Sequence, residues 1–262
     1  MQGLLLIDKP KTWTSFDVVN YVRRIVANAN GTKPKNTKVG HTGTLDPMAT
    51  GLLILLIGKE YTRRAGELSK LDKTYEVTMK LGEVSSTGDS EGEITPYLAA
   101  RHSELREESV PDEKRSFASL EDDAGEEGES NTVPAEKAVL EALERLQGPI
   151  MQVPPAYSAM KINGQRAYKL AREGKTVELE ARPVTIYSSE LTSYEYPYAK
   201  FTSRVSSGTY IRSLVVDLGE LLGTGAYMSD LKRTSIADFS LEKAVQVEGL
   251  NAEILETALS HL

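Results

Sequence analysis

Apolar and polar residues follow regular periods along much of this chain. Residues 4–10, "LLLIDKP", begin with four apolar residues and end at Pro10, and residues 52–57 are apolar throughout, so both stretches predict short buried strands. Residues 75–81 alternate between apolar and polar side chains, which predicts a half-buried strand. Residues 184–191 and 200–206 have a strand-like composition. The pattern therefore predicts at least five strands, spread from the N-terminal to the C-terminal part of the chain.

Four other segments carry apolar residues at the spacing of a helix. The first follows Thr14 or Ser15, either of which is a suitable N-cap. The others are expected at residues 61–68, 134–148 and 211–222. Strands and helices alternate irregularly, and no internal repeat is evident. This order favours an α+β domain built around a mixed sheet.

One segment departs from these patterns. Residues 104–129 hold eleven acidic and three basic side chains with few large apolar residues, so they bury too little surface to offset the entropy of ordering. We expect residues 98–131 to be a disordered acidic insertion within a single domain spanning residues 1–262. The whole chain has a net charge of −7, but outside residues 104–129 it has 28 basic and 27 acidic residues. A nucleic-acid partner therefore remains compatible with the charge.

Composition excludes several classes of chemistry. The chain has no cysteine, so disulfides, thiolate metal sites and cysteine nucleophiles are excluded. Residues 52–57 are too few to cross a bilayer, and the N-terminus lacks the features of a signal peptide. We expect a cytoplasmic protein without a membrane or metal partner. Of the three histidines, His102 lies in the acidic segment and His261 is the penultimate residue, which leaves His41 for a built site.

Two charged residues have unusual positions. Asp46 stands before a proline in the glycine-rich "GHTGTLDPMATG", directly ahead of a buried strand, and it either caps a turn or is a partly desolvated carboxylate that needs a cation. Arg212 is near the start of a helix, where the helix dipole disfavours positive charge. Arg212 is either a solvated surface residue or the partner of a buried anion.

Aromatic and basic residues suit a nucleic-acid partner. Tyr75 and Tyr210 are either core residues or platforms on which an extruded base stacks. Basic side chains that could follow a phosphate backbone recur along the chain, although any one of them is more often only a solvated charge. They include Lys9, Lys11, Arg23, Arg24, Lys33, Lys35, Lys38, Arg63, Arg64, Lys161, Arg166, Lys169 and Arg172.

Taken together, these stretches resemble the TruB family of tRNA pseudouridine synthases. "LLLIDKPKTWTSFDVV" is similar to the family's N-terminal motif and "GHTGTLDPMATGLL" to its catalytic motif. "KTYEVTMKLG", "QVPPAYSAMKINGQRAYKLAREG" and "GTYIRSLVVDLGELLG" resemble its tyrosine strand, its RNA-gripping segment and its arginine motif. The five matches occur in the family's order and cover most of the chain.

The resemblance implies a fold, a reaction and a set of residues. It implies the pseudouridine synthase fold, with a mainly antiparallel mixed sheet flanked by helices, and isomerisation of uridine 55 in the T loop of tRNA without a cofactor. Asp46 would be the catalytic aspartate, Arg212 its partner and Tyr75 the residue that stacks on the flipped uracil. The implied substrate-binding residues are His41, Tyr210, Lys9, Lys161 and Arg166. We expect a monomer that binds the T-arm stem-loop.

Three features depart from the family pattern. Thr12 stands where the family usually has glycine, and the acidic insertion follows "GDSEGEI". The residues after "LKRTSIADFSLEKAV" are too few for a C-terminal PUA RNA-binding domain, so none is expected. One alternative function is a catalytically silent protein that binds or folds tRNA. Another is a hydrolase acting through Asp46.

Overall fold

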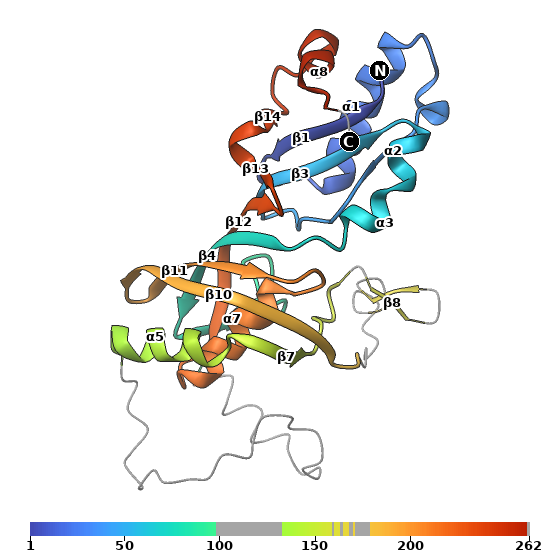
Figure 1. Ribbon diagram of the computed structural model, residues 1–262. Coiled ribbons are helices and arrows are strands. Elements are labelled where there is room, and N and C mark those ends of the chain that lie inside the picture. Colours follow the sequence, from blue (N-terminus) through green and yellow to red (C-terminus); the bar gives the residue numbers. More distant parts are fainter. Residues whose placement is uncertain (98–132, 159, 163–164, 168–169, 171–178, 261–262) are drawn as a thin grey trace, which may run out of the picture.

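The computed structural model describes residues 1–97, 133–158, 160–162, 165–167, 170 and 179–260 (Figure 1). The whole of the expected disordered insertion, residues 98–131, lies outside the described residues, so that expectation stays a prediction. None of the described helices is both long and apolar enough to span a bilayer.

Ten strands form one mixed sheet in the order β14-β1-β3-β12-β4-β11-β10-β7, with β2 beside β3 and β13 beside β12. The pairs β1–β14 and β3–β12 are parallel, and the other pairs are antiparallel. The predicted α+β class with a mainly antiparallel sheet is confirmed. The strands of the sheet are β1 (Gly3–Lys9), β2 (Val39–His41), β3 (Thr50–Ile57), β4 (Lys73–Leu81), β7 (Gly148–Gln152), β10 (Arg182–Glu195), β11 (Tyr198–Val205), β12 (Ala226–Ile236), β13 (Phe239–Ser240) and β14 (Val245–Gln246).

Helices cover both halves of this sheet. In Figure 1, α1 and α8 lie beside β1 and β3 in one half, whereas α5 and α7 pack against the half that contains β10 and β11. Two small hairpins, β5–β6 and β8–β9, stand outside the sheet. The helices are α1 (Ser15–Ala29), α2 (Lys59–Arg63), α3 (Ala65–Leu68), α5 (Glu136–Arg145), α7 (Ile211–Leu221) and α8 (Ala252–Ala258), and the hairpin strands are β5 (Glu83–Ser85), β6 (Ile94–Pro96), β8 (Lys161–Ile162) and β9 (Gln165–Arg166).

The apolar run in β3 is explained by burial on both of its faces. Leu53, Leu55 and Ile57 join a core cluster that includes the valines of α1. Leu52, Ile54 and Leu56 join a second cluster on the opposite face. A strand covered on both sides needs apolar residues at every position rather than at alternate ones. β3 is therefore a rigid support for the loop that precedes it.

The structure corrects two expectations about the elements. The helix expected at residues 61–68 is two short helices, α2 and α3, with Arg64 between them. Gly66 lies within the second helix, and glycine is a poor helix former, which agrees with the break. β12 was not expected at all, although it lies centrally between β3 and β4. Its Asp230, Lys232, Thr234 and Ser235 obscure the apolar pattern of a buried strand.

Candidate active site

Asp46 lies in the loop that joins β2 to β3. Leu45, Met48 and Ala49 of this loop are buried in a hydrophobic cluster, whereas 36% of the Asp46 side chain is exposed. The amide of Ala49 donates to the carbonyl of Asp46, which closes a tight turn around Pro47. The apolar neighbours thus anchor the loop and leave the carboxylate at its surface.

Residues from other segments hold this loop in place. The Ser15 hydroxyl and the backbone of Leu45 are bonded twice: Oγ donates to the carbonyl at 3.1 Å and accepts from the amide at 2.9 Å. The amide of Thr12 donates to the carbonyl of Pro47 at 2.8 Å, and Lys9 Nζ reaches the same carbonyl at 3.2 Å. The position of Asp46 therefore depends on β1, on the turn after it and on the start of α1.

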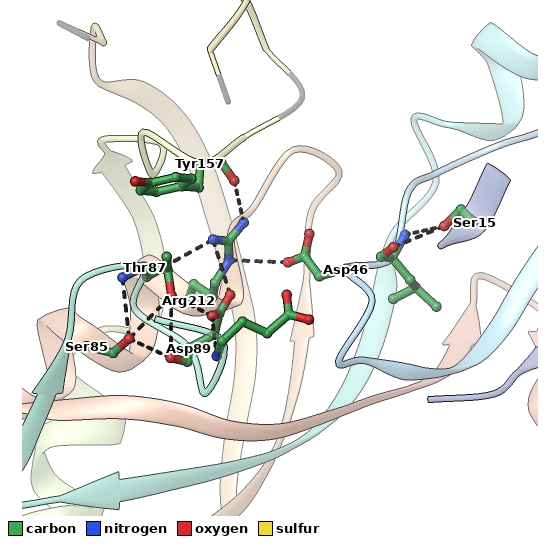
Figure 2. Close-up of polar contacts among 9 residues, drawn as sticks. Ser15, Asp46, Ser85, Thr87, Asp89, Tyr157 and Arg212 are labelled. Carbon is green, nitrogen blue, oxygen red and sulfur yellow. Dashed lines mark hydrogen bonds and ion pairs between the residues drawn. The ribbon is translucent and has the colours of Figure 1, made fainter. Parts of the chain in front are cut away.

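Arg212 is the cation that faces Asp46. It is the second residue of α7 and only 6% of its side chain is exposed. Its Nε lies 3.2 Å from Oδ2 of Asp46, so the pairing expected from the sequence is present. Nη1 and Nη2 also donate to the carbonyls of Thr87 and Tyr157, at 3.1 and 2.8 Å. Figure 2 shows the guanidinium held on several sides at once.

A second carboxylate, that of Asp89, completes the network. Its Oδ2 lies 3.3 Å from Nη1 of Arg212, and only 4% of its side chain is exposed (Figure 2). Its Oδ1 accepts from the Thr87 hydroxyl at 2.6 Å and from the amide of Glu91 at 3.0 Å. Two carboxylates therefore share one guanidinium, which accounts for a cation at the start of a helix, where the dipole disfavours it.

Our reading of the sequence missed Asp89. The motif "GDSEG" was the available signal, because an aspartate between two glycines in a short loop often takes a specific turn. Nothing in that motif indicates a contact with an arginine more than a hundred positions away. The pairing arises only when the loop and α7 pack together.

The electrostatics of the network make Asp46 an unusual carboxylate. Burial raises the pKa of Asp46 above its ordinary value. The positive charge of Arg212 opposes this rise in pKa, and the negative charge of Asp89 adds to it. Burial and the charges of Asp89 and Asp46 also raise the pKa of the nearby Glu91. Asp46 thus retains some basicity even though it is paired.

The predicted aromatic residues lie close to this network. Tyr75, on β4, is buried in the same cluster as Leu45 and Met48, the apolar residues of the Asp46 loop. Tyr210 directly precedes α7, its backbone exchanges two hydrogen bonds with the Gln152 side chain, and burial raises the pKa of its hydroxyl. The structure therefore brings both tyrosines to the region of Asp46.

Three other predicted substrate-binding residues, His41, Lys161 and Arg166, lie on strands. His41 is the last residue of β2 and pairs in register with Leu55 of β3, just ahead of the Asp46 loop. Lys161 and Arg166 face each other in register on the β8–β9 hairpin. The hairpin belongs to the segment that resembles the family's RNA-gripping segment.

Lys9, at the end of β1, is bonded to the chain around it. Its side chain is fully buried, and Nζ donates to the carbonyls of Pro10, Trp13 and Pro47. An ammonium group has three donors, and all three are used. These bonds join the end of β1 to the Asp46 loop, and the predicted contact of Lys9 with the substrate stays a prediction.

Solved structures share this fold. The chain in "Crystal Structure of a Cbf5-Nop10-Gar1 Complex" superposes with a TM-score of 0.64 at 24% identity, over 99% of this chain and 60% of that one. The chain in "Structure of H/ACA RNP bound to a substrate RNA containing 2'-deoxyuridine" gives a TM-score of 0.59 at 23% identity, over 95% and 52%. At these identities the comparison establishes the fold alone.

Family models identify the class. The model described as "TruB family pseudouridylate synthase (N terminal domain)" matches residues 30–120 and 112–211. The model described as "tRNA pseudouridylate synthase B C-terminal domain" matches residues 212–262. The fold, with Asp46 and Arg212 in contact within the matched region, is that of a pseudouridine synthase. The chain belongs to the TruB family, as its motifs predicted.

Curated relatives agree with this assignment. The tRNA pseudouridine synthase B of Aeromonas salmonicida (strain A449) is 40% identical over 253 residues, 95% of this chain and 66% of the relative. The proteins of the same name from Thermobifida fusca (strain YX) and Chlorobaculum tepidum are 40% and 42% identical, over 96% and 97% of this chain. This chain covers 75% and 91% of their lengths.

Proposed function

We propose that this protein is a tRNA pseudouridine synthase that isomerises uridine 55 in the T loop. The family assignment and the names of its relatives support the reaction and the class of RNA. The T-loop site is our further expectation from the five motifs, and the T-arm stem-loop is the proposed binding partner.

The reaction rearranges one nucleotide without a net addition. The bond between N1 of uracil and C1′ of ribose breaks, the base turns, and a bond forms between C5 and C1′. A proton leaves C5 and one is gained at N1. A nucleophile, a proton acceptor and a closed pocket suffice for these steps, so no cofactor is required. We assign the nucleophilic role to Asp46, which attacks either the base or C1′.

One observation carries this proposal: Asp46 is the exposed end of an otherwise buried ion-pair network. Arg212 approaches one oxygen of the carboxylate, Oδ2, while over a third of the side chain stays accessible. The pairing favours the ionised form that a nucleophile needs, whereas burial raises its basicity. A carboxylate used only for structure would be covered, as Asp89 is.

We propose supporting roles for the surrounding residues. Tyr75 stacks on the flipped uracil, and Tyr210 and His41 line the space for the extruded nucleotide. Lys161 and Arg166 contact the RNA backbone from the β8–β9 hairpin.

The alternative, a tRNA-binding protein without activity, does not explain Asp46. A carboxylate repels RNA phosphates, so binding alone would not favour one at this place.

The test is to incubate the protein with an unmodified tRNA transcript and map pseudouridine by carbodiimide labelling and primer extension. We expect one product, at position 55, and none in a transcript with cytidine there. Asp46→Asn should form no product while its Kd for tRNA stays within about tenfold, or about 1.4 kcal/mol, of the unmodified protein. Clear product formation by Asp46→Asn would refute its assignment. A hydrolase would instead release free uracil.

A further inference from the structure

A second buried arginine, Arg233, lies beneath the Asp46 loop. It is on β12, where it pairs in register with Gly51 of β3 on one side and with Tyr75 of β4 on the other. Only 1% of the residue is exposed. Its Nε donates to the carbonyl of Leu52 at 2.7 Å, and its Nη2 donates to the carbonyl of Gly43 at 3.1 Å.

These two carbonyls stand at opposite ends of the loop. Gly43 precedes Asp46 by three positions, and Leu52 follows it by six, within β3. One planar group therefore spans the base of the loop and fixes the separation of its ends. Ser15, Thr12 and Lys9 bind the middle of the loop, at Leu45 and Pro47, and the amide of Thr42 donates to the carbonyl of Ile54 at its start.

Close packing at Gly51 strengthens this attachment. Gly51 has a φ of +99°, and a Cβ there would lie 2.3 Å from the backbone oxygen of Arg233. The backbones of β3 and β12 thus approach more closely than a side chain would permit. The end of the loop therefore packs against the backbone of Arg233, and the side chain of Arg233 bonds to the start of the same loop.

Burying the charge of Arg233 at this place is unfavourable in free energy. In the described part of the chain no carboxylate forms an ion pair with it. Burial lowers the pKa of both Lys9 and Lys73, and the charge of Arg233 lowers these pKa values further. A buried ion without an opposite charge costs several kcal/mol, and an apolar side chain of similar volume avoids that cost. Packing alone does not explain an arginine at this position.

We infer that Arg233 is a positioning residue for the reaction: it holds both ends of the Asp46 loop so that the carboxylate meets Arg212. This inference rests on the proposed function for its effect on rate. Its effect on the loop can be measured independently. The fork of a guanidinium reaches two carbonyls in fixed directions, which a single ammonium nitrogen reproduces only in part.

The experiment compares Arg233→Met and Arg233→Lys with the matched control Lys73→Met. Lys73 is also a buried cation on the same sheet, but its Nζ donates to the carbonyls of Ser69 and Leu71, outside the Asp46 loop. Two readouts are used: amide hydrogen exchange in a peptide covering residues 40–52, and the single-turnover rate at saturating tRNA. Both are measured at a temperature where every variant is folded.

We expect Arg233→Met to speed exchange in this peptide and to lower the rate by about 100-fold, because a displacement of about 1 Å can have that effect. The Kd for tRNA should stay within about threefold, or about 0.7 kcal/mol. Arg233→Lys should give intermediate values, and it also serves if Arg233→Met does not fold. Lys73→Met should lower the melting temperature but leave both readouts near those of the unmodified protein.

The two proposals fail in different ways. Unchanged exchange of residues 40–52 in the Arg233 variants, or equal changes in Lys73→Met, would overturn the positioning role. Absence of pseudouridine with the unmodified protein would overturn the proposed function, and the exchange data would still decide the role of Arg233.

Discussion

Two loops bring a carboxylate to Arg212, and they differ in how far along the chain most of their anchoring residues lie. The Asp46 loop is fixed by residues far away in sequence: Ser15 is 30 positions from Leu45, and Arg233 is 190 positions from Gly43. The Asp89 loop, residues 86–93 between β5 and β6, is held largely by its own residues, and the distant Met228 amide adds one bond to the carbonyl of Gly88 at 3.0 Å. Its Asp89 is bonded by Ser85, Thr87 and Glu91, none more than four positions away.

The side chains of the two aspartates also differ in how much of them is exposed. Asp89 is 4% exposed and Asp46 is 36% exposed. The loop held largely by its own residues supplies a buried charge that fixes Arg212, and the loop anchored by distant segments supplies the accessible carboxylate. Asp46 is therefore placed by the assembled fold as a whole, whereas Asp89 is placed largely by its own turn and by a bridge to Met228 of β12.

The largest expected effect comes from neutralising the buried carboxylate. Asp89→Asn should lower the unfolding free energy by about 3 kcal/mol, because it removes one partner of a buried pair. Urea unfolding measures this loss. Asp230→Asn is the control, since Asp230 pairs with Lys11 at the surface and should contribute less than about 1 kcal/mol. Equal losses in the two variants would contradict the contrast in burial.

The same variant should shift the pH dependence of the rate. Asp46 must be ionised to act, so the rate falls as the pH drops through its pKa. The charge of Asp89 raises the pKa of Asp46, and its removal also leaves Arg212 to pair with Asp46 alone. Both changes favour the carboxylate. The acidic limb of the single-turnover pH profile should therefore move to lower pH, and a shift to higher pH would contradict this account.

A smaller effect is expected at a distant anchor of the Asp46 loop. Ser15→Ala leaves the buried amide and carbonyl of Leu45 without their partner, which should cost about 2 kcal/mol of unfolding free energy. The single-turnover rate should fall as well. Ser189→Ala removes another buried hydroxyl, which pairs with Ser203 on β10 and β11, and should reduce stability without changing the rate. An unchanged rate in Ser15→Ala would show that this anchor does not place Asp46.

The smallest effect should be a gain in stability. Thr12 has a φ of +72°, a region that favours glycine, and it stands where the family usually has that residue. Thr12→Gly should relieve this strain, keep the backbone bond to Pro47 and raise the unfolding free energy by about 1 kcal/mol. Thr37→Gly, at an ordinary φ of −90°, should lower it. A loss in Thr12→Gly would mean that the threonine side chain contributes more than its strain costs.

The sequence by itself determined many of the helices and strands and the identity of the family. Continuous apolar runs predicted β1 and β3, alternation predicted β4, and helical spacing predicted α1 and α7, because these patterns reflect burial of each element's own residues. The resemblance to the family, carried by motifs in the family's order, predicted that Asp46 pairs with Arg212. The positive φ of Thr12 also explains why the family usually has glycine at this position.

Only the tertiary structure decided which charges are buried and what they contact. Lys9, Arg233 and Asp89 look like ordinary polar residues in the sequence, and β12 was missed because polar residues interrupt its pattern. Local periodicity records whether a position faces the core. It does not record which carbonyl or carboxylate, brought from far along the chain, will meet a side chain there. Those partners exist only after the strands are ordered and packed, since they come from segments up to 190 positions apart.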